Sequence, residues 1–162
     1  MRGYLGLGSN EGDRLAALRA ARDAVGLQGV EVVRSSSVYE TAPQGPVHDQ
    51  ADFLNACLAI DTALCPEELL TACKRAERRL GRLPGGVHQG PRPIDVDVLM
   101  LGEVEQRSER LVLPHPEIRA RRFVLEPLLE LDPGLELPDG TPLAPLMDAV
   151  ADQRVRRVAQ PG

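Results

Sequence analysis

The order of six short segments constrains the fold of this chain more than any other feature of its sequence. Four apolar or alternating runs indicate strands, and they span residues 3–7, 30–38, 53–63 and 94–101. Two runs with apolar side chains three or four residues apart indicate amphipathic helices, at residues 10–25 and 66–80. The order is β-α-β-β-α-β, the ferredoxin-like or split βαβ pattern. We therefore predict an α+β fold with a largely antiparallel sheet and both helices on one face.

Turn and cap residues mark the ends of these segments. Ser9 or Asn10 can cap the first helix, and Gly81 can end the second. Two stretches rich in proline and glycine, residues 41–52 and 82–93, are predicted to be loops.

The remainder of the chain is expected to add only small elements to this core. We predict C-terminal helices at about residues 120–131 and 143–151, and weak order in residues 153–162. The length of 162 residues is typical of one domain, and we see neither an internal repeat nor a long linker. We therefore treat residues 1–162 as a single domain.

Composition excludes several classes of protein. A net charge of −5 argues against non-specific binding of nucleic acid. No apolar run reaches membrane-spanning length, and the N-terminus has no signal-peptide pattern. Three cysteines without metal-type spacing suggest reduced thiols. We expect a cytoplasmic protein that binds neither nucleic acid nor a membrane.

Two aspartates on an otherwise apolar strand are the most informative residues. Asp95 and Asp97 are two positions apart, so their side chains leave the same face about 6.6 Å from each other. Mg²⁺ would remove the repulsion between them, since it takes one or two carboxylates and completes its shell with water and phosphate oxygens. Such a pair can also hold two metal ions. A solvated face of a half-buried strand is the alternative, and the pair alone does not decide between them.

Basic residues gather around this pair in the sequence. Arg92 precedes it between two prolines that stiffen the backbone, and His115 also lies between prolines. Such cations suit a polyphosphate held with Mg²⁺, because phosphoryl transfer depends on positioning and charge neutralisation. For other basic residues a solvated helix face is the better interpretation, namely Arg75, Arg78, Arg79 and Arg119. The chain has no P-loop motif, so ATP would bind without one.

The stretch His-Gln-Gly-Pro-Arg-Pro-Ile-Asp-Val-Asp-Val-Leu, residues 88–99, resembles the signature of the 6-hydroxymethyl-7,8-dihydropterin pyrophosphokinase family. The supporting matches are Tyr39-x-Thr41-x-Pro43-x-Gly45, Phe53-Leu54-Asn55, Glu77 with Gly81-Arg82, Arg110-Leu111-x-x-Pro114-His115 and Arg121-x-Phe123. They cover nearly the whole chain. The resemblance implies an ATP-dependent diphosphotransferase of folate biosynthesis, in which the hydroxymethyl oxygen of the reduced pterin attacks the β-phosphorus of ATP and AMP is released.

The resemblance also implies residue roles. Two Mg²⁺ ions would be bound by Asp95 and Asp97. Catalytic roles are implied for Arg82, Arg92, Asp95 and Asp97. Together with the basic surroundings, it implies ATP contacts from Lys74, Glu77, His88, Arg92, Val98, Arg110, Val112, His115 and Arg121. The pterin pocket would be formed by Thr41, Ala42, Pro43, Gln44, Phe53, Asn55 and Phe123.

The residues themselves support a pterin site. Phe53 and Phe123 are the only phenylalanines in the chain, and two rings can hold a flat heterocycle. Asn55 alternates onto the same strand face as Phe53 and offers a donor and an acceptor. The chain departs from the family at Pro84, His88, Gln89 and Val112, where relatives often carry arginine, arginine, tryptophan and a polar residue, and we assign no role to Pro84 or Gln89.

Two other functions remain open from the sequence. The chain could be a non-catalytic ferredoxin-like module that binds RNA or senses a small molecule, although RNA binding normally uses exposed aromatics that this chain largely lacks. It could also be an ATP-using transferase with a different acceptor alcohol. The enzyme is expected to act as a monomer.

Overall fold

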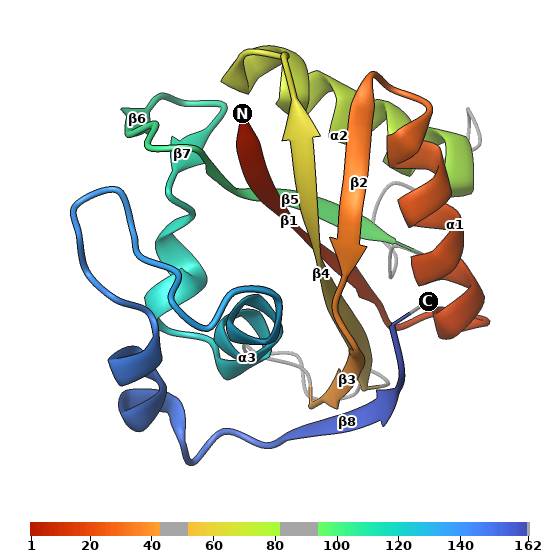
Figure 1. Cartoon of the computed structure of the whole chain (residues 1–162). Coiled ribbons are helices and arrows are strands. Elements are labelled where there is room, and N and C mark those ends of the chain that lie inside the picture. Colours follow the sequence, from red (N-terminus) through yellow and green to blue (C-terminus); the bar gives the residue numbers. More distant parts are fainter. Residues whose placement is uncertain (43–51, 82–93, 162) are drawn as a thin grey trace.

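An antiparallel sheet of six strands forms the centre of the molecule (Figure 1). The structure is a computed structural model, and it describes residues 1–42, 52–81 and 94–161. The strand order is β5-β1-β4-β3-β8, and β2 also pairs with β4. The strands are β1 (Arg2–Ser9), β2 (Val30–Ser35), β3 (Val38–Thr41), β4 (Phe53–Thr62), β5 (Asp95–Leu101) and β8 (Val155–Ala159). The predicted α+β class with an antiparallel sheet is confirmed.

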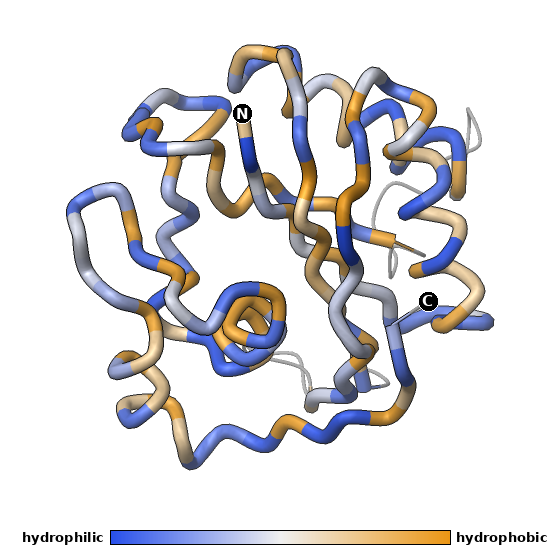
Figure 2. Tube along the Cα trace, in the orientation of Figure 1, coloured by the Kyte–Doolittle hydropathy of each residue, from blue (hydrophilic) through white to orange (hydrophobic). Residues whose placement is uncertain are grey.

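Helices cover both faces of this sheet. On one face, α1 (Arg14–Gly26) and α2 (Pro66–Gly81) pack together, as predicted. On the opposite face lies α3 (Arg122–Leu131) (Figure 1). Hydrophobic and hydrophilic positions alternate around the turns of α1 and α3 (Figure 2), as expected for helices with one buried face.

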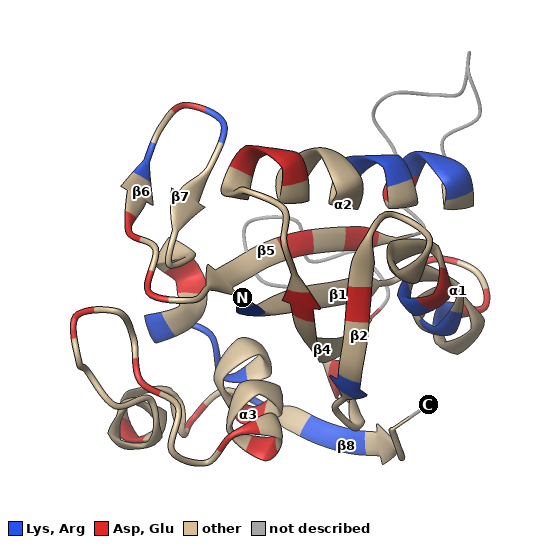
Figure 3. Cartoon of the chain, turned by 45° about the horizontal axis from the view of Figure 1, so that its top comes forward, with Lys and Arg blue, Asp and Glu red and all other residues tan. Residues whose placement is uncertain are grey.

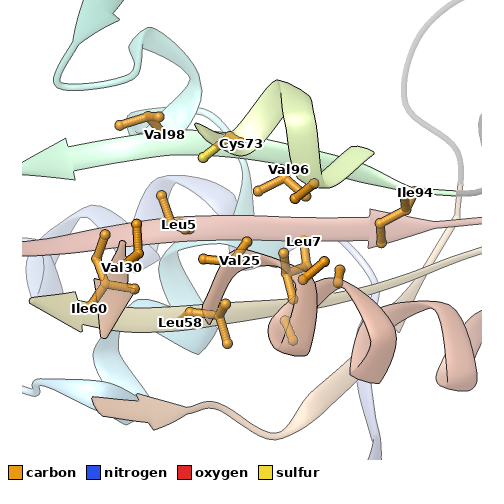
Figure 4. Packing of buried hydrophobic residues seen from close by; sticks show 14 of the residues in the cluster. Leu5, Leu7, Val25, Val30, Leu58, Ile60, Cys73, Ile94, Val96 and Val98 are labelled. Carbon is orange, nitrogen blue, oxygen red and sulfur yellow. The ribbon is translucent and has the colours of Figure 1, made fainter. Parts of the chain in front are cut away.

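The alternation of side chains along the strands divides the core into two clusters. Leu5, Leu58 and Val96 point towards α1 and α2 and are fully buried (Figure 4). Tyr4 and Cys57 belong to the opposite cluster, which packs against α3. Successive residues of a strand face opposite sides, so the same strands supply both clusters.

The first helix begins later than predicted. Its N-cap is Asp13, whose side chain accepts a hydrogen bond from the Ala16 N–H at 3.1 Å. The expectation that Ser9 or Asn10 caps this helix is wrong, because β1 continues to Ser9, which pairs with Leu54 of β4. Pairing with β4 thus determines the conformation of Ser9, although serine is a favourable N-cap residue.

The second predicted strand is divided into β2 and β3. Ser36, between them, is buried, and its Oγ accepts a hydrogen bond from the Cys57 N–H at 2.9 Å. The next residue, Ser37, donates from its N–H and its hydroxyl to the carboxylate of Glu130 in α3. The break therefore ties the sheet to α3.

The C-terminal region differs most from expectation. Residues predicted to be weakly ordered form β8, which pairs with β3. The predicted helix at 143–151 is the 3₁₀ segment η2 (Ala144–Val150). A hairpin and a further 3₁₀ turn were not predicted: β6 (Gln106–Arg107), β7 (Val112–Leu113) and η1 (Pro116–Arg119). Within the described residues, no helix is both long and apolar enough to cross a membrane.

Candidate active site

A pocket opens on the α3 side of the sheet, where α3 leaves part of the strands uncovered. Four strands supply its floor, since β5, β1, β4 and β3 each contribute residues to the lining. Its rim comes from η1 and from the first turn of α3. The two predicted metal ligands and several predicted pterin residues therefore meet in one cavity, although they come from distant parts of the sequence.

Two glycines of β1 form the centre of this floor. Gly6 lies between Asp97 of β5 and Cys57 of β4, and Gly8 lies between Asp95 and Asn55. A Cβ atom on Gly8 would stand 3.1 Å from Oδ1 of Asn55. The missing side chains thus leave space between the carboxylates on one side and the β4 residues on the other.

The two carboxylates are positioned by an ordinary strand with a bulge after it. Val96 and Val98 turn into the core, at 0% and 2% exposure. Asp95 and Asp97 therefore face the pocket, where Asp95 is half-buried and Asp97 is exposed. Leu99 follows on the same face by alternation, and the register with β1 shifts beyond Val98, so Met100 joins that face as well.

The donor set at this position suits Mg²⁺. Two carboxylates open to a pocket leave coordination positions for water and phosphate oxygens, as that ion requires. Among residues 1–42, 52–81 and 94–161 there is no group of three or more His, Cys, Asp or Glu side chains able to hold a metal ion. A closed structural metal site is thus absent from the described part of the chain.

The predicted pterin residues line the other half of the pocket. Phe53 and Phe123, from β4 and α3, are both half-buried and both reach the cavity. Asn55 donates from Nδ2 to the Thr41 hydroxyl at 3.0 Å, which fixes its amide group. The lining also includes Ala42. This half of the pocket thus combines two rings with one oriented amide.

His115 lies at the rim with a defined orientation. Its backbone N–H donates to the Leu99 carbonyl at 2.8 Å, and its Nδ1 accepts from the Glu117 N–H at 3.1 Å. A neutral imidazole that accepts at Nδ1 carries its proton on Nε2. The remaining nitrogen is therefore a hydrogen-bond donor, which suits a phosphate oxygen.

Arg121 lines the same pocket as His115 and is held by two neighbours. Its Nε lies 3.2 Å from Oε2 of Glu117, and its guanidinium carbon lies 5.5 Å from the centre of the Phe123 ring. Both contacts favour an arginine that stays in place over the pocket.

The other described residues predicted to bind ATP lie outside this pocket, around the outer edge of β5. Glu77 is buried, accepts from the Val96 N–H at 2.9 Å, and has Lys74 Nζ at 3.5 Å. Because Val96 turns its N–H to this edge, the backbone of Val98 two residues later faces the same way. Figure 3 shows the acidic bands of β5 beside the basic C-terminal half of α2.

Arg110 and Val112 complete this outer group near β7. Arg110 is exposed, with its guanidinium 3.9 Å from the Glu67 carboxylate. Val112 is half-buried and pairs with Arg107 in the β6–β7 hairpin. Their roles stay predictions, as do those of five residues that lie outside the described part of the chain: Pro43, Gln44, Arg82, His88 and Arg92.

Several lining residues were missed by sequence reasoning. Gly6 and Gly8 were not among the predicted site residues, although their alternation with Leu5 and Leu7 was a signal that one face of the strand lacks side chains. Glu117 gave no signal. Cys57 was not predicted to line the site either; burial raises the pKa of its thiol, which disfavours the reactive thiolate.

Comparison with known proteins places these observations in a family. The family model of 7,8-dihydro-6-hydroxymethylpterin-pyrophosphokinase (HPPK) matches residues 4–133. A 2-amino-4-hydroxy-6-hydroxymethyldihydropteridine pyrophosphokinase from Methylorubrum extorquens is 48% identical over 135 residues, which cover 83% of this chain and 84% of that protein. The protein of the same name from Pseudomonas aeruginosa is 39% identical over 156 residues, covering 96% and 95%.

Longer relatives contain a matching part. The mitochondrial folate synthesis bifunctional protein of Pisum sativum is 46% identical over 127 residues, which are 78% of this chain but only 24% of that protein. A solved structure of HPPK-DHPS in complex with substrates superposes with a TM-score of 0.71 at 11% identity, covering 92% of this chain and 43% of that one. Wild-type HPPK-DHPS of Plasmodium falciparum gives 0.69 at 13% identity, covering 92% and 44%. The structural matches show a shared fold, and this chain spans less than half of those proteins.

Proposed function

Because this chain belongs to the 7,8-dihydro-6-hydroxymethylpterin-pyrophosphokinase family, we infer that it transfers the pyrophosphoryl group of ATP to 6-hydroxymethyl-7,8-dihydropterin in folate biosynthesis. The hydroxymethyl oxygen would form a bond to the β-phosphorus of ATP while the bond from that phosphorus to the bridging α–β oxygen breaks. The hydroxyl proton passes to solvent, and AMP leaves with the bridging oxygen. The observation that carries this proposal is the juxtaposition of two carboxylates and two phenylalanine rings in one pocket.

The pterin would lie between Phe53 and Phe123. Ring stacking suits a flat heterocycle, and the fixed amide of Asn55 offers its oxygen to the pterin edge. Thr41 and Ala42 border the same space. In this arrangement the hydroxymethyl group can extend across the glycine floor towards β5, where the carboxylates stand.

Asp95 and Asp97 would hold Mg²⁺, and we propose two ions. Mg²⁺ bound there would neutralise the triphosphate and bring its β-phosphorus to the acceptor. His115 would donate from Nε2 to a phosphate oxygen, and Arg121 would contact another. Arg82, Arg92 and His88 are proposed as further phosphate contacts on the resemblance alone.

The nucleotide base would lie along the outer edge of β5. There the backbone polar groups of Val98 face away from β1, because β5 is the edge strand of the sheet. The residues around this edge are Lys74, Glu77, Arg110 and Val112. This placement puts the adenine on one side of the carboxylates and the pterin on the other, as a transfer between the two requires. Pro43 and Gln44 are proposed to complete the pterin pocket.

We also propose that residues 1–162 form one pyrophosphokinase domain that acts as a monomer in the cytoplasm. The stand-alone bacterial relatives, of which this chain covers most of the length, support this organisation. Sedimentation of the purified protein at the monomer mass, 17.6 kDa, would agree with it, and a stable dimer would not.

The decisive experiment identifies the nucleotide product. With Mg²⁺, ATP and the reduced pterin, the chain should form AMP and the pterin diphosphate, without ADP. Absence of AMP together with tight pterin binding would instead indicate a non-catalytic sensor. AMP formation with other alcohols, at rates equal to that with the pterin, would contradict the proposed acceptor.

A further inference from the structure

The first turn of α3 lacks a cap of its own. Arg121 occupies the N-cap position without making a side-chain capping bond, and the first turn contains no acidic residue. The N–H groups at a helix start need partners from elsewhere in such a case. This turn carries Arg121 and Phe123, both of which line the pocket, so the group that caps it also sets the position of the pocket wall.

The C-terminal tail supplies that group through Gln153. Its Oε1 accepts from the Arg122 N–H at 2.9 Å, and its Nε2 donates to the Ala120 carbonyl at 2.8 Å. These two backbone groups stand on either side of Arg121. One side-chain amide therefore hydrogen-bonds the backbone on both sides of Arg121, a residue of the pocket lining.

The first turn of α3 in turn holds the tail by hydrogen bonds. The Arg122 guanidinium donates to the carbonyls of Gln153 at 2.8 Å and Ala151 at 3.2 Å. The tail segment that carries Gln153 is therefore held by the same turn that Gln153 caps, so the two parts order each other.

Beyond Gln153 the tail reaches the opposite wall of the pterin half. It passes below α3 and becomes β8, which pairs with β3 (Figure 1). Arg156 in β8 bonds Glu40 of β3 at 2.7 Å, next to Thr41 of the pocket lining. The tail thus links the wall that carries Phe123 to the wall that carries Thr41.

We propose that Gln153 is a positioning residue for the pocket, which fixes the backbone around Arg121 and thereby the placement of Arg121 and Phe123. It lies beyond residue 133, where the match to the family model ends. This proposal rests on the proposed function for the identity of the substrate. The positioning of one pocket wall by the C-terminal tail does not depend on that identity.

The test compares two variants that each lose a donated and an accepted hydrogen bond. Gln153→Ala removes the cap of α3. Thr62→Ala is the matched control: the Thr62 hydroxyl accepts from the Leu64 N–H and donates to the Gly29 carbonyl, at the end of β4 opposite to Phe53. Steady-state AMP formation gives kcat and KM for the pterin, and thermal unfolding gives Tm for each variant.

We expect Gln153→Ala to lower kcat/KM for the pterin about 5- to 30-fold, mainly through a higher KM, as the loss of two hydrogen bonds predicts. Both variants should lower Tm by a similar amount, because each loses two hydrogen bonds. Thr62→Ala should nevertheless leave kcat/KM within about twofold of the value for the unchanged protein. A Gln153→Ala variant with normal kcat/KM, or a Thr62→Ala variant with an equal loss, would overturn the proposal.

Isothermal titration calorimetry measures pterin binding without turnover. The pterin is titrated into the protein in the presence of Mg²⁺ and a non-hydrolysable ATP analogue. Its Kd should rise by a similar factor in Gln153→Ala only. Failure of the unchanged chain to form AMP would remove the proposed function. If the unchanged chain forms AMP normally and Gln153→Ala shows the same kcat/KM and Kd, only the proposed role of Gln153 would be refuted.

Discussion

The two faces of the sheet are built from the same strands but do different work. On the α1–α2 face, β1 presents Leu5 and Leu7, both buried in a continuous apolar cluster. On the other face, the same strand presents Gly6 and Gly8 to the pocket. The first face is closed by packing and stabilises the fold. The second is closed by α3 over only part of its area, and the uncovered part holds the polar groups of the site.

Substitutions on the two faces should therefore affect different properties of the protein. Large side chains removed from the α1–α2 face should cost stability without altering the chemistry. Small changes on the open part of the other face should alter the chemistry with little cost in stability.

The largest effect is expected for Asp97→Ala, on the open face. Loss of a metal ligand should reduce kcat by about 10³-fold or more, because charge neutralisation carries most of phosphoryl transfer. Since Asp97 is exposed, Tm should hardly change. The matched control is Asp61→Ala, which removes an exposed carboxylate of β4 and its ion pair with Arg2. Equal rates in the two variants would refute the metal assignment.

The next effect is expected for Leu58→Ala, on the packed face. Leu58 is fully buried, so its truncation should lower the free energy of unfolding by about 2–5 kcal/mol. Below the unfolding transition, the KM for the pterin should stay near normal. Urea denaturation gives the free energy, and initial-rate assays give KM. A large rise in KM with unchanged stability would mean that the two faces are not separable.

A smaller effect is expected for Gly8→Ala. The added Cβ would approach Oδ1 of Asn55 to 3.1 Å, so the amide must shift and kcat/KM for the pterin should fall about 10-fold. Gly26→Ala is the control, because a Cβ there meets nothing within 4 Å. Normal kcat/KM in Gly8→Ala would show that the glycine floor is not needed for substrate.

The smallest effect is expected on stability, for the hydrogen bonds by which Glu130 attaches α3 to the sheet. Burial alone would raise the pKa of this carboxyl, but hydrogen bonds from Tyr39 and Ser37 outweigh it and hold the pKa below the usual 4.5. A lowered pKa in the folded state contributes stability at higher pH, which is lost as pH falls through 4.5 and below.

The Tyr39 hydroxyl stays protonated throughout, since burial raises its pKa to about 12. Glu130→Gln should therefore be less stable than the unchanged protein near neutral pH, and the difference should shrink as the solution is acidified past 4.5. Urea midpoints across this pH range measure it. A difference that grows on acidification would contradict the assignment.

Most of the architecture was predictable because it depends on local periodicity. The alternation in β4 and the helical spacing in α2 are properties of neighbouring residues, and both elements lie where they were predicted. The strand β8 was not predictable in the same way. In its sequence, Val-Arg-Arg-Val-Ala, two adjacent arginines break the alternation of apolar and polar residues, and the strand is held by pairing with β3 and by the ion pair between Arg156 and Glu40.

For the site, the chemical groups follow from the amino-acid sequence alone: two carboxylates on one strand face, two phenylalanines, and the motifs that identify the family. Which of these groups meet depends on how the strands pair. The antiparallel register places Gly6 and Gly8 between Asp95 and Asp97 on one side and β4 on the other. The distant Gln153 caps the turn that carries Phe123. Residue type is a local property, whereas register and long-range capping arise from pairing between segments far apart in the chain, which local pattern does not encode.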